Sequence, residues 1–105
     1  MNSTRLNKLR SYIGFAIKAG KAVFGYEGII TSRRPPKAVL VSKDINRTSM
    51  SRLTVYCNEK KTNLIEIEPD YFRHIVAKEN IKAIGIADIN LSKAVIDNIG
   101  VDVNE

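Results

Sequence analysis

The stretch PPKAVLVSKD, residues 35–44, decides the fold class of this chain. Its centre, AVLV at positions 38–41, is continuously apolar and β-prone, which is typical of a strand covered on both faces. Pro35 and Pro36 cannot continue a helix, so they mark a boundary on the amino side of this strand. A strand covered on both faces needs a helical layer on each side of its sheet.

Three other segments are predicted to be strands. LIEI at 64–67 and AIGIA at 83–87 are short and apolar, and AVF at 22–24 is an extended piece that leads into Gly25. With the central stretch they make four strands in one sheet.

Helical patterns separate these strands. A first helix, capped by Ser3 or Thr4 and stopped by Gly20, is predicted from apolar residues at helical spacing, namely Leu6, Leu9, Ile13, Ala16 and Ile17. Ile29 and Ile30 belong to a short second helix, which must end before the two prolines.

Three further helices are expected. Ser49 is the predicted N-cap of a helix whose inward residues are Leu53, Tyr56 and Cys57. Pro69 suits the first turn of the next, with Phe72, Ile75 and Val76, and the last helix carries Leu91, Ala94, Val95 and Ile99. This alternation predicts an α/β protein with a central sheet between helical layers, and one domain over residues 1–105.

Composition narrows the environment and the class of partner. The apolar runs are far too short to cross a bilayer, and nothing in the first five residues marks the chain for export. A single cysteine, Cys57, permits neither an intramolecular disulfide nor a cysteine-rich zinc site, so we expect a cytoplasmic protein. Lys and Arg number 17 against 11 Asp and Glu, and the net charge of +6 favours polyanionic partners.

The segment from Lys21 to Arg34 has the features of an RNA-binding surface. Gly25 and Gly28 allow close backbone approach, Tyr26 offers a stacking face, and Glu27 can accept hydrogen bonds from base edges. The predicted phosphate contacts of this region are Lys18, Lys21, Arg33 and Arg34. The alternative is an ordinary strand-to-helix turn with solvated cations.

Two later segments follow strands and are expected at the same end of the sheet. Lys43 and Asp44 follow the second strand, and the third is followed by a loop and helix containing Asp70, Tyr71, Arg73 and Lys78. Together with the first loop they would make one binding face, although solvated turns explain the same residues.

An enzymatic function requires a base, a nucleophile or a metal site. The one histidine, His74, has Asp70 four residues earlier, and Cys57 is predicted to face the core without a base beside it. No phosphate-binding glycine motif and no pair of histidines at ligand spacing is present in the sequence. We therefore expect no catalysis, no cofactor, no metal and no small-molecule substrate.

In order along the chain, several segments resemble a known family. They are residues 9–20 with the run AIKAGK at 16–21, VFG at 23–25, KAVLVSKD at 37–44, Leu53 and Cys57, IGIAD at 84–88, and the final helix. The chain resembles the kink-turn-binding ribosomal proteins called L-seven-Ae and L-thirty-e, most closely their small bacterial YlxQ-type branch. The resemblance implies a three-layer α-β-α sandwich, and we predict a central mixed four-stranded sheet.

The resemblance also implies binding to a kink-turn, a sharp RNA bend beside tandem sheared G·A pairs, through the loop that opens helix two and a second loop before the last strand. The family signature of glycine, a small residue, asparagine, glutamate and a later lysine falls on Gly25, Tyr26, Glu27, Gly28 and Thr31. Gly25 agrees and Glu27 is a polar substitute, whereas Gly28 and Thr31 lack the carboxylate and the cation.

We therefore predict a monomeric, non-enzymatic protein that binds structured RNA, with ribosomal RNA one candidate. Because of the departures at Gly28 and Thr31, the alternative is a protein-interaction module of the same fold that has lost RNA recognition.

Overall fold

The computed structural model describes the backbone of residues 3–103 and the side chains of residues 4–99. Helices and strands alternate along it, in the order α1 (Ser3–Lys18), β1 (Ala22–Phe24), α2 (Gly25–Thr31), β2 (Ala38–Ser42), α3 (Arg47–Lys60), β3 (Asn63–Ile67), α4 (Pro69–Ile75), β4 (Ala83–Ile86) and α5 (Ile89–Val103). No helix within residues 3–103 is long and apolar enough to cross a membrane.

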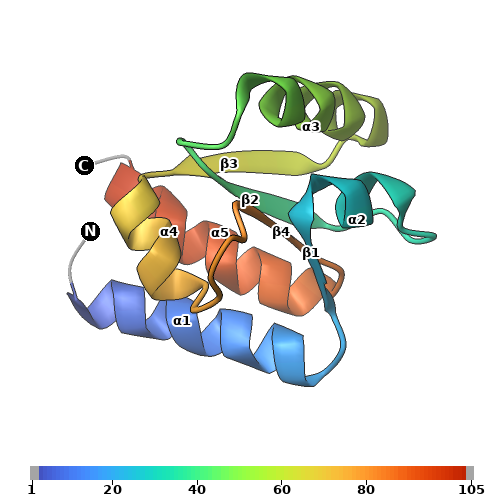
Figure 1. The fold of residues 1–105 in the computed structure, drawn as a ribbon. Helices are drawn as coiled ribbons and strands as arrows, with labels where there is room; N and C mark the ends of the chain where they lie inside the picture. The colour runs from blue at the N-terminus through green and yellow to red at the C-terminus, as the bar shows by residue number, and fades with distance from the viewer. Residues whose placement is uncertain (1–2, 104–105) are drawn as a thin grey trace.

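The four strands form one mixed sheet in the order β1-β4-β2-β3. β2 runs parallel to β3, whereas β4 is antiparallel to both β1 and β2 (Figure 1). Ala38–Ser42 is buried at every position because β2 has a strand on each side and a helical layer on each face. The α/β class and the mixed four-stranded sheet are confirmed.

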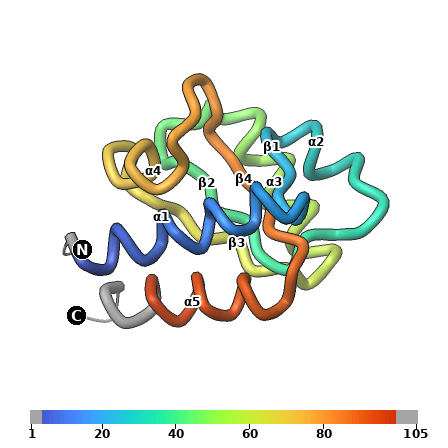
Figure 2. Tube along the Cα trace, turned by 90° about the horizontal axis from the view of Figure 1, so that it is seen from below, coloured from blue at the N-terminus to red at the C-terminus, as the bar shows by residue number. Residues whose placement is uncertain are grey.

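Helices cover both faces of the sheet. α1, α4 and α5 lie on one face and α2 and α3 on the other (Figure 1), and Figure 2 shows α1 and α5 side by side. The first face buries Leu9 and Ile13 of α1, Phe72 of α4 and Val95 of α5 against Leu40 and Ile84. The second buries Ile29 of α2 and Leu53, Tyr56 and Cys57 of α3 against Val39 and Val41. Alternate residues of β2 thus serve the two cores, as the strand period requires.

Gly20 stops α1 at its carboxyl end, as the sequence predicted. Gly20 has φ +69°, and its N–H donates to the carbonyl of Ile17 at 3.1 Å, while Lys21 N–H donates to Ala16 at 2.8 Å. This left-handed residue satisfies the last carbonyls of the helix and turns the chain into β1.

The predicted N-cap of α3 was wrong. Asn46 caps the helix, and its side-chain oxygen accepts the N–H of Ser49 at 2.8 Å. Ser49 is therefore inside the first turn and is buried. Both residue types are good caps, and the tight turn after β2, closed by Ile45 N–H to the carbonyl of Ser42 at 3.1 Å, brings Asn46 to the helix start first.

Gly85, in the middle of β4, lets Pro36 and α2 approach the sheet closely. A Cβ atom at this position would lie 2.7 Å from Cγ of Pro36 and 3.3 Å from Cγ1 of Ile29. The missing side chain therefore lets both Pro36 and α2 pack directly on the strand, which fixes the height of α2 above the sheet.

Candidate nucleic-acid interface

The strands end at two opposite rims of the sheet, and these rims organise the candidate residues. Since β4 is antiparallel to β1 and β2, strands β1, β2 and β3 all run in one direction. We call the rim where these three end and β4 begins the carboxyl rim, and the rim where they begin and β4 ends the amino rim. The three predicted loops after β1, β2 and β3 all start at the carboxyl rim.

At the carboxyl rim, the start of α2 contacts the loop before β4. Phe24 precedes the helix, no described side chain caps the helix start, and Gly25 has φ +77°. Nζ of Lys78 lies 4.9 Å from the centre of the Phe24 ring, a cation–π contact that joins residues far apart in sequence. The half-buried Tyr26 donates its hydroxyl to Oε1 of the exposed Glu27 at 3.2 Å.

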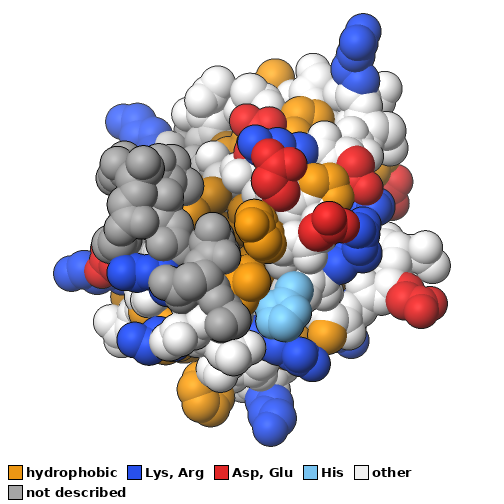
Figure 3. All heavy atoms as spheres, turned by 90° about the vertical axis from the view of Figure 1, so that its left-hand side faces the viewer, with side chains coloured by type: hydrophobic (Ala, Val, Ile, Leu, Met, Phe, Trp, Pro, Cys, Tyr) orange, Lys and Arg blue, Asp and Glu red, His pale blue; other side chains and the backbone are white. Residues whose placement is uncertain are grey.

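Most other charges of the carboxyl rim are paired. Nζ of Lys43 lies 2.7 Å from Oε1 of Glu68, and Nζ of Lys82 lies 2.7 Å from Oδ2 of Asp44. Arg73 and Asp70 form a third ion pair within α4. Figure 3, which faces the side towards which β2 and β3 point, shows acidic and basic side chains interspersed.

These pairs shift ionisation in the direction that their geometry requires. The hydrogen bond from Lys82, and then that from the Ser42 hydroxyl, lower the pKa of Asp44. The hydrogen bond to Glu68 and its negative charge raise the pKa of Lys43. The two pairs therefore stabilise the charged forms of Lys43 and Asp44.

The remaining predicted cations lie at the amino rim. Lys21, Arg33 and Arg34 line a hollow of about 310 Å³ together with Gly20, Val23, Ser32 and Ala87. Lys18 ends α1 just before this hollow. Three further cations flank the starts of the neighbouring strands: Lys37 precedes β2, and Lys60 and Lys61 precede β3. The three-residue strand β1 separates Lys21 from Gly25, so the structure does not bring these cations together with the Gly25 loop.

Two signature positions already make contacts within the protein. A Cβ atom on Gly28 would lie 3.1 Å from Cγ1 of Val23, so Gly28 faces β1. The hydroxyl of Thr31 donates to the carbonyl of Glu27 at 2.7 Å. Tyr71 is half-buried and packs against the core under α1 and α5, which leaves part of its ring at the surface.

Sequence reasoning did not single out Lys82, Lys37, Lys60 and Lys61. Each flanks a strand, so their positions next to strand ends were available as a signal. What the sequence did not contain was the direction of the strands: β4 runs antiparallel to β2, which puts Lys82 at the carboxyl rim, whereas β2 and β3 are parallel, which puts the other three at the amino rim.

The candidate catalytic residues are not assembled into one site. Asp70 pairs with Arg73, and His74 is exposed. Cys57 is buried, and this burial raises the pKa of its thiol, which disfavours the nucleophilic thiolate. Among the residues whose side chains are described, no group of three or more metal-ligating residues is arranged around a common point.

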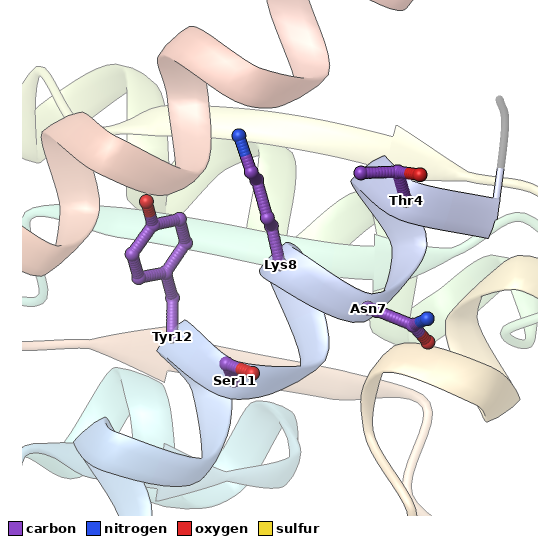
Figure 4. A pocket seen from close by; sticks show the side chains of 5 residues that line it. All are labelled: Thr4, Asn7, Lys8, Ser11 and Tyr12. Carbon is purple, nitrogen blue, oxygen red and sulfur yellow. The ribbon is translucent and has the colours of Figure 1, made fainter.

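Another hollow lies along α1. It has a volume of about 420 Å³ and is lined by Thr4, Asn7, Lys8, Ser11 and Tyr12. In Figure 4, Lys8 and Tyr12 point towards α5, whereas Asn7 points towards α4. All five described lining residues come from α1, and the hollow is open to the surface.

Comparison with known proteins adds a fold and no function. No protein-family model and no curated protein sequence matches this chain. Among solved structures, it resembles a protein of unknown function from Bacillus halodurans C, with a TM-score of 0.77 and 19% sequence identity over 89% of this chain and 97% of the other. At this identity the likeness shows that the two chains share the α/β fold with a four-stranded mixed sheet and helices on both faces.

Proposed function

We propose that this protein is a non-enzymatic RNA-binding protein that recognises a kink-turn or a similarly bent RNA at its carboxyl rim, with ribosomal RNA as the first candidate. The observation that carries the proposal is the contact between Lys78 and Phe24. It joins the loop before β4 to the start of α2, so that the two segments expected to hold the RNA form one continuous surface.

The groups on this surface have the chemistry for recognising unpaired bases. Tyr26 keeps part of its ring accessible, and stacking of one base on an aromatic ring contributes about 1–3 kcal/mol. The exposed carboxylate of Glu27 can accept hydrogen bonds from base amino groups. Gly25, which carries no side chain, leaves the backbone open to close approach.

The ion pairs of the carboxyl rim fit a role in positioning. Lys43 and Arg73 are held near their carboxylates at exposed positions, where screening by solvent leaves an ion pair little net strength. An RNA phosphate can therefore replace the carboxylate at little cost. Such contacts fix orientation and carry no sequence information.

The test compares a kink-turn RNA with the same RNA in which the tandem G·A pairs are changed to Watson–Crick pairs, using gel shift at fixed salt. We expect at least tenfold tighter binding of the kink-turn. The Tyr26→Ala variant should lose roughly 5- to 150-fold of this affinity, the equivalent of about 1–3 kcal/mol, while Tyr26→Phe should keep most of it. Equal affinity of the wild type for the two RNAs would reject the proposal.

A second candidate function is a protein-interaction module, and one surface favours it. Ile30, Ser51, Arg52, Val55, Tyr56 and Glu59 line a hollow of about 340 Å³ between α2 and α3. Val55 in this hollow is 55% exposed and shares it with the apolar Ile30 and Tyr56, so the hollow offers apolar surface to a protein partner. Salt discriminates between the two functions, because RNA affinity falls steeply as salt rises whereas an apolar protein interface changes little.

A further inference from the structure

We propose that the amino rim is a second RNA-binding surface, which holds the phosphate backbone of a double-helical segment other than the one bound at the carboxyl rim. Its centre is the hollow lined by Lys21, Arg33 and Arg34. The choice of RNA as the polyanion rests on the proposed function, whereas the existence of the surface does not.

The topology of the sheet gathers this surface from distant parts of the chain. Lys18 and Lys21 flank the turn between α1 and β1, and Arg33, Arg34 and Lys37 belong to the connection between α2 and β2. Lys60 and Lys61 come from the end of α3, just before β3. The hydroxyl of Thr62 donates to the carbonyl of Pro36 at 3.0 Å, which ties these last two segments together.

The charges here are not neutralised as they are at the other rim. All seven cations are exposed, and none forms an ion pair with a carboxylate among the side chains of residues 4–99. Two acidic residues lie close in sequence to this surface: Glu59 precedes Lys60, and Asp88 follows Ala87 of the hollow. The Asp88 carboxylate accepts the N–H of Leu91 at 2.9 Å at the start of α5. At the carboxyl rim, by contrast, Lys43, Arg73 and Lys82 each have a carboxylate partner.

The backbone that carries these cations is fixed. The N–H of Ala87 donates to the carbonyl of Lys21 at 2.8 Å, and the N–H of Lys37 donates to Ile86 at 2.8 Å. The Ser32 hydroxyl donates to the carbonyl of Arg34 at 2.9 Å, and Pro35 and Pro36 stiffen the same connection. Binding a polyanion would therefore order long side chains on a rigid base, which limits the entropy lost.

The side chains of the amino rim suit the phosphate backbone of an RNA duplex, and the separation of the two rims makes this duplex a different segment from the RNA bound at the carboxyl rim. Lys and Arg side chains supply phosphate contacts, and the described lining of the hollow includes no aromatic side chain on which an unpaired base could stack. The two rims lie at opposite ends of β2, whose five residues span roughly 17 Å. They face opposite directions, so the protein would bridge two RNA segments.

The test uses a plain 16-base-pair RNA duplex without a kink, with binding measured by fluorescence anisotropy over a range of salt. The triple variant Lys21→Ala, Arg33→Ala, Arg34→Ala is compared with a control triple of equal charge loss on the outer helical faces: Lys8→Ala, Arg10→Ala, Arg52→Ala. We expect the amino-rim triple to weaken duplex binding at least tenfold and to reduce the salt slope by about 2–3 units, close to one per phosphate contact. The control triple should change binding less than threefold, and both should unfold at the wild-type midpoint.

Separate outcomes decide the two proposals. If both triples weaken duplex binding alike, only net charge matters and the amino rim is not a site. Tighter binding of the wild type to phosphatidylserine vesicles than to the duplex, lost in the amino-rim triple, would assign the rim to membranes and overturn the RNA assignment. An amino-rim effect on the duplex together with no kink-turn discrimination would support this surface and reject the proposed function instead. An unchanged kink-turn discrimination ratio in the amino-rim triple is expected if the two surfaces act separately.

Discussion

Replacing Gly85 with alanine tests how closely α2 is held to the sheet. The new Cβ would lie 2.7 Å from Cγ of Pro36, whereas ordinary contact begins at 3.4 Å, so the two must separate by about 0.7 Å. Pro36 cannot move freely, because its carbonyl accepts from Thr62 and the next residue, Lys37, is bonded to Ile86. The clash is therefore with a fixed ring and not with the end of a flexible side chain.

The expected loss of stability is about 1–2 kcal/mol. Inserting a methyl group into a packed core costs about 1–3 kcal/mol. Replacing glycine by alanine restores about 0.4–1 kcal/mol by restricting the unfolded chain. With a urea dependence of about 1.5–3 kcal/mol per molar, the unfolding midpoint should fall by roughly 0.3–1.3 M.

Gly14 supplies the matched control. It lies within α1, and a Cβ there would meet nothing within 4 Å. Gly14→Ala should raise the free energy of unfolding by up to about 1 kcal/mol, since alanine favours the helix. If Gly85→Ala proved as stable as Gly14→Ala in urea unfolding, the close packing of Pro36 and α2 on β4 would be refuted.

Three other changes test individual features of the fold. The buried Tyr56 hydroxyl has no hydrogen-bond partner among the described residues, so Tyr56→Phe should stabilise the protein by about 1 kcal/mol in urea unfolding, and a loss would reveal a partner. The pKa of Asp44 is lowered from 3.8, its value in the unfolded chain, so the ionised carboxylate stabilises the fold above pH 3.8 and this stability is lost as the pH falls through the folded pKa. The free energies of unfolding of the wild type and Asp44→Asn should therefore converge below that pH. A difference that stays constant with pH would contradict the bonds from Lys82 and Ser42. Gly25 has φ +77°, so Gly25→Ala should lower the free energy of unfolding by about 1–2 kcal/mol in thermal or urea unfolding, although the new Cβ meets no atom within 4 Å. An unchanged midpoint would mean that this residue does not hold the left-handed conformation.

The distribution of charge is the feature of this structure with most bearing on function. Six excess positive charges could have been spread evenly over the surface. Instead, the carboxyl rim joins Lys43, Arg73 and Lys82 to carboxylates, while the amino rim gathers cations that have no such partner among the described side chains. For the two proposals, the paired charges of the carboxyl rim suit selection among RNA shapes, and the basic amino rim suits contacts with phosphates of any sequence.

The sequence by itself determined the layers. The buried run at 38–41 required cover on both faces, the apolar spacing predicted each helix, and Gly20 ended the first of them. These features depend on neighbours within a few residues, which is the range over which propensity and periodicity act.

Only the tertiary structure decided how the candidate residues are grouped. Asp44 and Lys82 are 38 residues apart, and the antiparallel placement of β4 between β1 and β2 is what brings them together. Lys21 and Gly25 lie at opposite ends of β1, and the shared direction of β1 and β2, both antiparallel to β4, brings Arg33 and Arg34 to the rim of Lys21 although all four residues lie within one short stretch of sequence. Proximity along the chain therefore failed as a guide to proximity in space, because strand direction is set by packing between distant segments and not by the residues of any one strand.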